Sequence, residues 1–183
     1  MKKWIIVPIV LLICSYLVGQ HPPQEIVLKD GRSFLVGKIE AESLQAKPYQ
    51  TWYNKNFNAY SVDTETIKSL KDDLNPYHIL VFMGTWCGDS KREVPRFLKL
   101  LEAADFPSNQ LKIVAVDRRK EFYKKSPSGE EWGLDIRRVP TFIFLKDGKE
   151  ANRIVESPVV SLEKDILAIV GGQKYVPNYS LSD

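Results

Sequence analysis

Two continuous apolar runs separated by an amphipathic helix constrain the fold more than any other feature. Residues 78–84 (HILVFMG) and 111–117 (LKIVAVD) are almost uninterrupted apolar segments, as is typical of strands buried on both faces. Residues 90–104 between them repeat apolar side chains at helical spacing, at Val94, Phe97, Leu98 and Leu101. Because parallel strands need a crossover connection, this strand–helix–strand order predicts two parallel strands of one sheet.

The C-terminal part of the chain completes an α/β pattern. Residues 141–155 (TFIFLKDGKEANRIV) predict two strands joined by a turn at Asp147-Gly148, a favoured hairpin dipeptide. Residues 161–170 predict a helix that begins after the capping residue Ser161. We therefore expect a central mixed sheet, with its first pair of strands parallel and its last pair antiparallel, and with helices on both faces.

The N-terminal third of the chain predicts a small appendage. Residues 25–40 alternate apolar and polar side chains around Asp30-Gly31, which indicates a β-hairpin. Residues 41–73 predict two helical pieces, the second capped by Thr64. The first piece carries the aromatic side chains Tyr49, Trp52, Tyr53, Phe57 and Tyr60. These rings could line a ligand groove, but packing of an appendage onto a core is the preferred interpretation.

These patterns divide the chain into segments. Residues 25–75 form the expected appendage, 76–172 the main domain and 173–183 a C-terminal tail. In residues 1–19, two lysines follow Met1 and precede an apolar run, which is the layout of a secretory signal peptide. That run is shorter than the roughly 20 residues that span a bilayer comfortably. We expect an exported, periplasmic protein with no stable membrane span after cleavage of the signal.

Two other fates of the N-terminus are less favoured than cleavage. The apolar run could be retained as a membrane anchor. Alternatively, Cys14 could be acylated as in a lipoprotein, but Ile13 precedes it where such signals have a small residue.

Composition excludes some classes of function. The formal net charge is +3 and the basic residues are scattered, so we expect no nucleic-acid partner. A zinc site would need more ligands than His21, His78 and one remaining cysteine can supply. We expect neither a metal nor a cofactor.

Cys87 is the main candidate for a reactive residue. The chain has two cysteines, and Cys14 would leave with the signal peptide, so the mature protein would hold Cys87 alone. Cys87 follows the strand at 78–84 and begins a helix, where backbone N–H groups and the helix dipole stabilise a thiolate. A lone exported cysteine is either buried and inert or a thiol with a chemical role.

Charged and polar neighbours modify that thiol. Lys91 and Arg92 lie one helical turn further on and favour ionisation, whereas the carboxylate of Asp89 opposes it. Ser90 could donate a hydrogen bond to the sulfur. We expect the net effect to be easier ionisation of Cys87.

A second motif, Val139-Pro140-Thr141, stands directly before the strand that begins at 141. Proline is tolerated at the first residue of a strand. If its peptide bond is cis, Val139 would expose backbone groups near Cys87 that can pair with an extended peptide.

Together these motifs, over residues 79–171, resemble the thioredoxin family. The matching elements, in chain order, are Trp86-Cys87-Gly88, the helix-kinking Pro95, the cis-proline turn Val139-Pro140-Thr141 and the hairpin turn 146–149. The resemblance implies a thioredoxin-like fold in which Cys87 is the attacking nucleophile. It also implies that Trp86 flanks the thiol, with Gly88, Val139, Pro140 and Thr141 beside the substrate.

The sequence departs from that family at three positions. Ser90 occupies the place of the resolving cysteine, Asp89 replaces a proline, and Val81 replaces a buried aspartate. In dithiol enzymes the second cysteine releases the mixed disulfide. With a C-G-D-S motif, we expect Cys87, assisted by Ser90, to act as a monothiol thiol–disulfide oxidoreductase or isomerase. Its partners would be cysteine-containing exported proteins or low-molecular-weight thiols.

Alternative functions remain open at this point. The main alternative is a binding or chaperone-like module that keeps the fold without turnover. A cluster-binding monothiol glutaredoxin is disfavoured by Trp86 and by the export signal. A peroxiredoxin is disfavoured because Gly84 stands where that chemistry expects a threonine. The basic stretch 118–125 could steer acidic partners, although solvated loop charge is the preferred interpretation.

Overall fold

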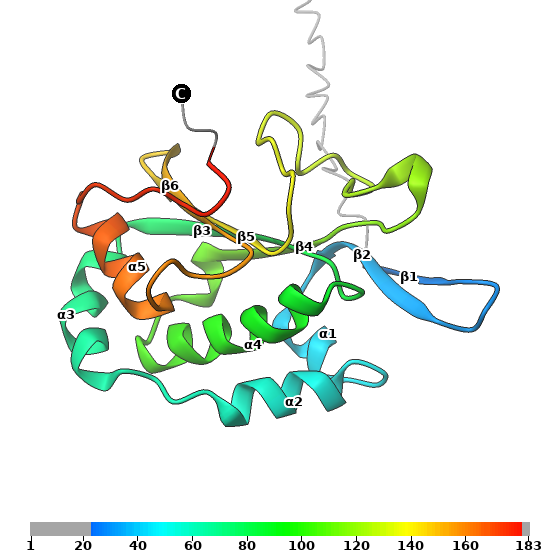
Figure 1. Ribbon diagram of the computed structural model, residues 1–183, viewed down its shortest axis with the longest axis horizontal. Coiled ribbons are helices and arrows are strands. Elements are labelled where there is room, and N and C mark those ends of the chain that lie inside the picture. The colour runs from blue at the N-terminus through cyan, green and yellow to red at the C-terminus, as the bar shows by residue number, and fades with distance from the viewer. Residues whose placement is uncertain (1–22, 181–183) are drawn as a thin grey trace, which may run out of the picture.

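The computed structural model describes residues 23–180 (Figure 1). The predicted signal peptide at 1–19, with Cys14, lies outside the described residues, as do His21 and residues 181–183. None of the helices within the described range is long and apolar enough to cross a membrane.

The centre of the molecule is a mixed sheet. Within residues 23–180 it has six strands in the order β1-β2-β4-β3-β5-β6. β3 pairs parallel with β4 and antiparallel with β5, and β5 pairs antiparallel with β6. The predicted mixed α/β sheet is therefore confirmed. The strands are β1 (Gln24–Val27), β2 (Ser33–Ile39), β3 (Tyr77–Met83), β4 (Leu111–Ala115), β5 (Thr141–Lys146) and β6 (Lys149–Val155).

The helices differ in detail from the predicted ones. The α-helices are α1 (Ala41–Gln45), α2 (Gln50–Ala59), α3 (Thr64–Leu74), α4 (Gly88–Ala103) and α5 (Leu162–Val170), and the 3-10 helices are η1 (Ser108–Gln110) and η2 (Lys120–Phe122). The segment 41–73 was predicted to form two helical pieces but forms three. Thr64 is not the cap of α3, because the Asp63 carboxylate accepts the hydrogen bond from Thr66 N at 3.1 Å. The predicted Ser161 cap of α5 is confirmed, with Lys164 N donating at 3.2 Å.

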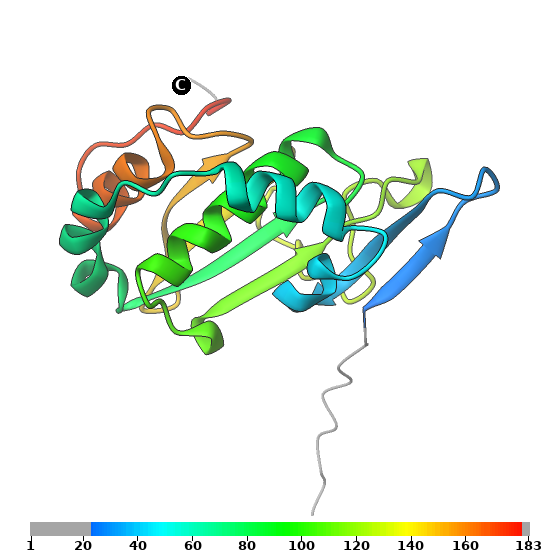
Figure 2. The same cartoon turned by 90° about the horizontal axis from the view of Figure 1, so that it is seen from below.

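Helices lie on both faces of the sheet, but unequally. All five α-helices within residues 23–180 contribute to the larger core, where Ile79, Val81 and Met83 project from β3. Figure 2 shows α2 and α4 lying together across this face. The opposite face has a smaller core around Phe82, Val114, Val116, Val139 and Ile143. It is covered by the long segment 117–140, whose one helical turn is η2.

The N-terminal segment shares the sheet and core of the main domain. β2 pairs antiparallel with β4, with Gly37 opposite Ala115. Leu44 of α1 and Tyr53 of α2 are buried in the larger core. The expected boundary at residue 75 therefore separates no second core, because the hairpin extends the edge of the central sheet.

Replacing Phe97 tests how much the stability of the larger core depends on packing of α4. The Phe97 side chain is 0% exposed, and its ring centroid lies 4.4 Å from that of Phe142 on β5. We expect Phe97→Ala to lower the free energy of unfolding by about 3–5 kcal/mol. The measurement is urea unfolding followed by circular dichroism. Val27→Ala, at a side chain that is 68% exposed, is the control and should change stability by less than about 0.5 kcal/mol. A loss below about 1 kcal/mol for Phe97→Ala would contradict this packing.

Candidate active site

Cys87 lies at the point where β3 gives way to α4. It is the N-cap residue of α4 with an extended backbone (φ −86°, ψ 132°), and its N–H donates to Gly84 O at 2.8 Å. The side chain is half-buried, and its Sγ lies 3.2 Å from Val139 O. The sulfur is therefore held at a helix N-terminus, as predicted from the sequence, while remaining accessible to solvent.

The pairing of β3 and β5 brings the cis-proline turn to this cysteine. Phe82, near the end of β3, faces Thr141 at the start of β5. The residue before that strand, Pro140, therefore lies beside the β3–α4 turn. Its peptide bond with Val139 is cis. Thr141 Oγ1 donates to Arg138 O at 2.7 Å, and this hydrogen bond stabilises the turn.

Trp86 forms one wall of the site. Its Nε1 donates to Val116 O at 2.9 Å, and its ring centroid lies 5.7 Å from that of Tyr123. The indole also covers Gly84, where an added Cβ would lie 2.6 Å from the Trp86 ring. Position 84 must therefore be glycine for the indole to lie across the backbone.

Ser90 has a different role from the one that its position suggests. Its side chain is completely buried, and its hydroxyl accepts a hydrogen bond from Gly84 N at 3.1 Å. The expected hydrogen bond to the sulfur of Cys87 is not formed within residues 23–180. The hydroxyl instead satisfies a buried backbone N–H group in the turn that carries the thiol.

Charges around the first turn of α4 largely neutralise one another. Arg92 donates to Asp89 at 2.7 Å and to the buried carboxylate of Glu93 at 2.6 Å. Asp89, expected to oppose ionisation of Cys87, and Arg92, expected to favour it, are thus paired with each other. Lys91 has no carboxylate partner within the described residues.

A second cation approaches the thiol from the segment that follows β4. Lys124 Nζ donates to Arg137 O and lies 4.9 Å from the centroid of the Tyr123 ring. Burial lowers the pKa of Lys124 below its ordinary value, and the charge of Arg138 adds to this, while Glu156 and Cys87 act in the opposite direction. The ammonium group is thus close enough to interact electrostatically with the cysteine.

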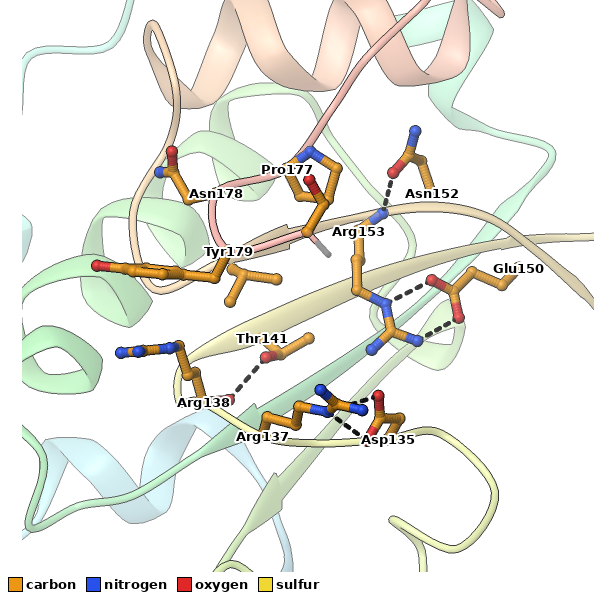
Figure 3. A pocket seen from close by; sticks show the side chains of 12 residues that line it. Asp135, Arg137, Arg138, Thr141, Glu150, Asn152, Arg153, Pro177, Asn178 and Tyr179 are labelled. Carbon is orange, nitrogen blue, oxygen red and sulfur yellow. Dashed lines mark hydrogen bonds and ion pairs between the residues drawn. The ribbon is translucent and has the colours of Figure 1, made fainter. Parts of the chain in front are cut away.

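A pocket of about 350 Å³ lies on the far side of the cis-proline turn. Figure 3 shows Arg137, Arg138 and Arg153 around it, beneath the C-terminal segment. Each of these arginines has a carboxylate partner, namely Asp135, Glu156 and Glu150 respectively. The side chain of Tyr179 lies over Arg138, with 3.8 Å between the ring centroid and the guanidinium carbon. The positive charge of this pocket is therefore already compensated.

The structure places most of the sequence-predicted site residues at one end of the sheet. Trp86, Cys87 and Val139 belong to one apolar cluster on the smaller-core face, and Pro140 and Thr141 adjoin it. Gly88 is exposed as the first residue of α4. Within residues 23–180, no cluster of three or more histidine, cysteine or carboxylate side chains could hold a metal ion.

Sequence reasoning missed Tyr123, which packs on Trp86, and Lys124, whose charge interacts with Cys87. Both lie in the polar stretch after β4, for which the sequence indicated a short helix and a loop. Their one local signal is the dense basic and aromatic run at 118–125, which says nothing about the direction in which each side chain points.

Comparison with known proteins agrees with this geometry. A sequence model described as thioredoxin matches residues 39–164. The chain belongs to the thioredoxin family. Among curated relatives, a thioredoxin H-type of Populus jackii is 32% identical over 89 residues, which cover 49% of this chain and 57% of the relative. Thioredoxin H9 of Arabidopsis thaliana is 33% identical over 89 residues, which cover 49% of this chain and 56% of the relative. The chain thus spans somewhat more than half the length of these thioredoxins.

One solved structure resembles a larger part of this chain than these curated relatives do. A protein of unknown function from Pseudomonas aeruginosa superposes with a TM-score of 0.53 at 14% identity, over 74% of this chain and 93% of that one. At this identity the likeness concerns the fold alone. The thioredoxin match begins at residue 39, inside β2, so most of the expected appendage falls within the family region.

Replacing Ser90 separates a structural role from a chemical one. Ser90→Ala removes the acceptor of the Gly84 N–H group, and a buried donor without a partner costs about 1–3 kcal/mol of stability. We expect that loss in chemical denaturation, with the alkylation rate of folded Cys87 essentially unchanged. Ser69→Ala, at an exposed position of α3, is the control for stability. A large fall in alkylation rate with unchanged stability would show instead that the hydroxyl acts on the sulfur.

Lys124 offers an electrostatic test. Lys124→Gln removes the nearby cation, which should slow alkylation of Cys87 at neutral pH by about two- to fivefold, because the thiolate is the reacting form. Stopped-flow measurement with iodoacetamide, a neutral reagent, gives the rate. Lys125→Gln changes the net charge equally at an exposed neighbour. Equal slowing by both variants would contradict a specific effect of Lys124.

Proposed function

We propose that this thioredoxin-family protein carries out monothiol thiol–disulfide exchange through Cys87. The observation that carries the proposal is the position of its sulfur. It lies at the N-terminus of α4, 3.2 Å from Val139 O beside the cis-proline turn, and it is the one free cysteine within residues 23–180. A half-exposed thiol between Trp86 and that turn can be reached by a disulfide in an extended peptide.

The exchange proceeds in two displacements that conserve electrons. The thiolate of Cys87 attacks one sulfur of a substrate disulfide, so a Cys87–substrate disulfide forms and the original bond breaks. The other substrate sulfur leaves as a thiolate and takes up a proton from solvent. A second thiolate then attacks the substrate sulfur bound to Cys87 and releases Cys87 unchanged.

The second thiol must come from outside this site. Ser90 cannot supply it, and its hydroxyl is engaged with Gly84 N. Either the other cysteine of the substrate or a low-molecular-weight thiol completes the cycle. The first route shuffles disulfides within one substrate and the second transfers them, and neither produces net dithiol reduction by this chain alone.

The proposed substrates are cysteine-containing exported proteins. This part of the proposal is supported by residues 1–19, whose sequence has the layout of a signal peptide, and by the prevalence of disulfides in exported proteins. Export and periplasmic localisation are part of the same proposal.

The competing proposal is a binding module without turnover. It is favoured by Val81, which is completely buried at the position where classical thioredoxins carry an acid that assists proton transfer. A valine side chain cannot transfer a proton. The two proposals differ in whether Cys87 is needed, since a binding module should retain its partners after Cys87→Ser.

Two variants test the proposed chemistry. Near neutral pH, Cys87 should react with a neutral alkylating agent faster than N-acetylcysteine does, and Cys87→Ser should abolish disulfide shuffling of a scrambled substrate protein. Ser90→Cys places a second thiol one helical turn from the first, and it should raise dithiothreitol-dependent reduction of insulin by about tenfold or more, because release becomes intramolecular. An unreactive Cys87, or shuffling that survives Cys87→Ser, would overturn the proposal.

A further inference from the structure

A groove beside the active site is formed by the N-terminal segment. The turn of the β1–β2 hairpin, the start of α2, the β3–α4 turn and the residue after Asp117 enclose a volume of about 350 Å³. Three cationic and three aromatic side chains dominate its lining: Arg32, Lys91, Arg118, Tyr49, Trp52 and Trp86. We call it the cationic groove.

Direct contacts connect the cationic groove to the nucleophile. Trp86 precedes Cys87 in the chain, and Lys91 N donates to Cys87 O at 3.0 Å. Thr85 Oγ1 accepts from Leu35 N of β2 at 3.0 Å. Asn56 Nδ2 of α2 donates to Lys91 O at 3.1 Å. The walls of the groove are therefore fixed relative to the thiol by the hairpin on one side and by α2 on the other.

Two carboxylates lie next to the lining, and each has its own partners. Asp30 receives two hydrogen bonds from the Arg32 guanidinium, which are the first cause of its lowered pKa. Glu25 accepts from Ser33 at 2.7 Å and from Tyr49 at 2.8 Å. These contacts leave two of the three cations without a carboxylate.

The three cations outnumber the two carboxylates, so the groove has an excess of one positive charge. Lys91 and Arg118 form no ion pair within the described residues, and both are partly buried. In the pocket on the other side of the cis-proline turn, by contrast, all three arginines are paired. Compared with that pocket, the cationic groove has charge available to a partner.

The aromatic side chains define the rest of the recognition chemistry. Tyr49 is buried and forms the floor, and its ring centroid lies 6.3 Å from that of the half-buried Trp52. Trp86 closes the end next to Cys87. Apolar rings beside free cations fit a side chain with an aliphatic stem and a carboxylate head, because the stem packs and the head pairs.

We propose that the cationic groove docks an acidic segment of the polypeptide whose disulfide is attacked by Cys87. Carboxylates of that segment pair with Lys91 and Arg118, and its side-chain stems pack on Trp52. A polypeptide is the occupant because Trp86 lines the groove and precedes Cys87 in the chain, so residues next to the reacting cysteine of a substrate polypeptide can reach the groove. The inference rests on the proposed function for its substrate but not for the binding itself.

Binding measured on Cys87→Ser tests the docking independently of any exchange. The probes are two ten-residue peptides without cysteine that differ only in glutamate or glutamine at three positions. Nuclear magnetic resonance of the tryptophan indole N–H groups reports the site. We expect the glutamate peptide to shift the signals of Trp52 and Trp86 while leaving that of Trp132, which is 80% exposed, in place. The glutamine peptide should bind at least about tenfold more weakly.

Charge-matched variants decide whether the groove itself is responsible. Lys91→Gln with Arg118→Gln should weaken binding of the glutamate peptide by about tenfold. Lys149→Gln with Lys174→Gln removes the same charge at exposed positions outside the groove and should leave the affinity unchanged. Equal loss in both pairs, or equal affinity for the two peptides, would overturn the proposal. So would binding of succinate as tight as that of the peptide, because the groove would then be a small-anion site.

A kinetic measurement separates failure of the docking from failure of the chemistry. The same peptides, each carrying a cysteine in mixed disulfide with 2-thiopyridine, are mixed with the wild-type protein. A glutamate peptide that binds the groove without exchanging would overturn the proposed function and leave the docking in place. Exchange at equal rates for both peptides, with no shift of Trp52, would overturn the docking and leave the function.

Discussion

The pairing of β3 with a neighbour on each side determines the arrangement of everything else in this protein. On one side its parallel pairing with β4 brings Val116 N within 2.8 Å of Met83 O. On the other side its antiparallel register with β5 sets Phe82 opposite Thr141. Three chain segments therefore meet where β3 ends, and the turn that carries Cys87 lies among them. The apolar end of β3 makes this possible, since Val81, Phe82 and Met83 are all buried and packing on both faces of the sheet fixes them.

The active site shows how a thioredoxin-family turn accommodates serine in place of a second cysteine. Ser90 is buried and its hydroxyl accepts from Gly84 N, so the serine supports the turn that carries Cys87 and leaves no second thiol at this position. The neighbouring Asp89 is paired with Arg92, which limits its effect on the thiol. The groups left near the sulfur include the N-terminus of α4, Lys91 in its first turn and Lys124. In the proposed exchange, this environment serves the attack on a disulfide, and a thiol from outside the site completes the cycle.

The N-terminal segment contacts the turn that carries Cys87 and is more than an accessory to the main domain. β2 extends the central sheet through β4, and one of its backbone groups bonds to the turn before Cys87. α2 bonds to the first turn of α4 through Asn56. In the proposed docking, these contacts make the N-terminal segment one wall of the groove beside Cys87. Of the aromatic cluster around α2, Tyr53 is buried in the core, and Trp52, Phe57 and Tyr60 pack against it, as the sequence favoured. Trp52 at the same time lines the cationic groove.

The sequence by itself determined the strand–helix–strand order, the position of Cys87 at a helix start, the proline turn at 139–141 and the hairpin at 147–148, because each depends on local spacing or on backbone preferences of single residues. It could not place β2 against β4, since an edge strand is chosen by long-range pairing and its alternation fits many partners. The sequence could not show that Ser90 bonds to Gly84 and not to the sulfur of Cys87, or that Arg92 pairs with Asp89. Several partners lie within reach of each of these side chains. Only the tertiary structure decided which charges are compensated and which, like Lys91 and Arg118, remain free within the described residues, because compensation depends on atoms that the chain brings together from distant positions.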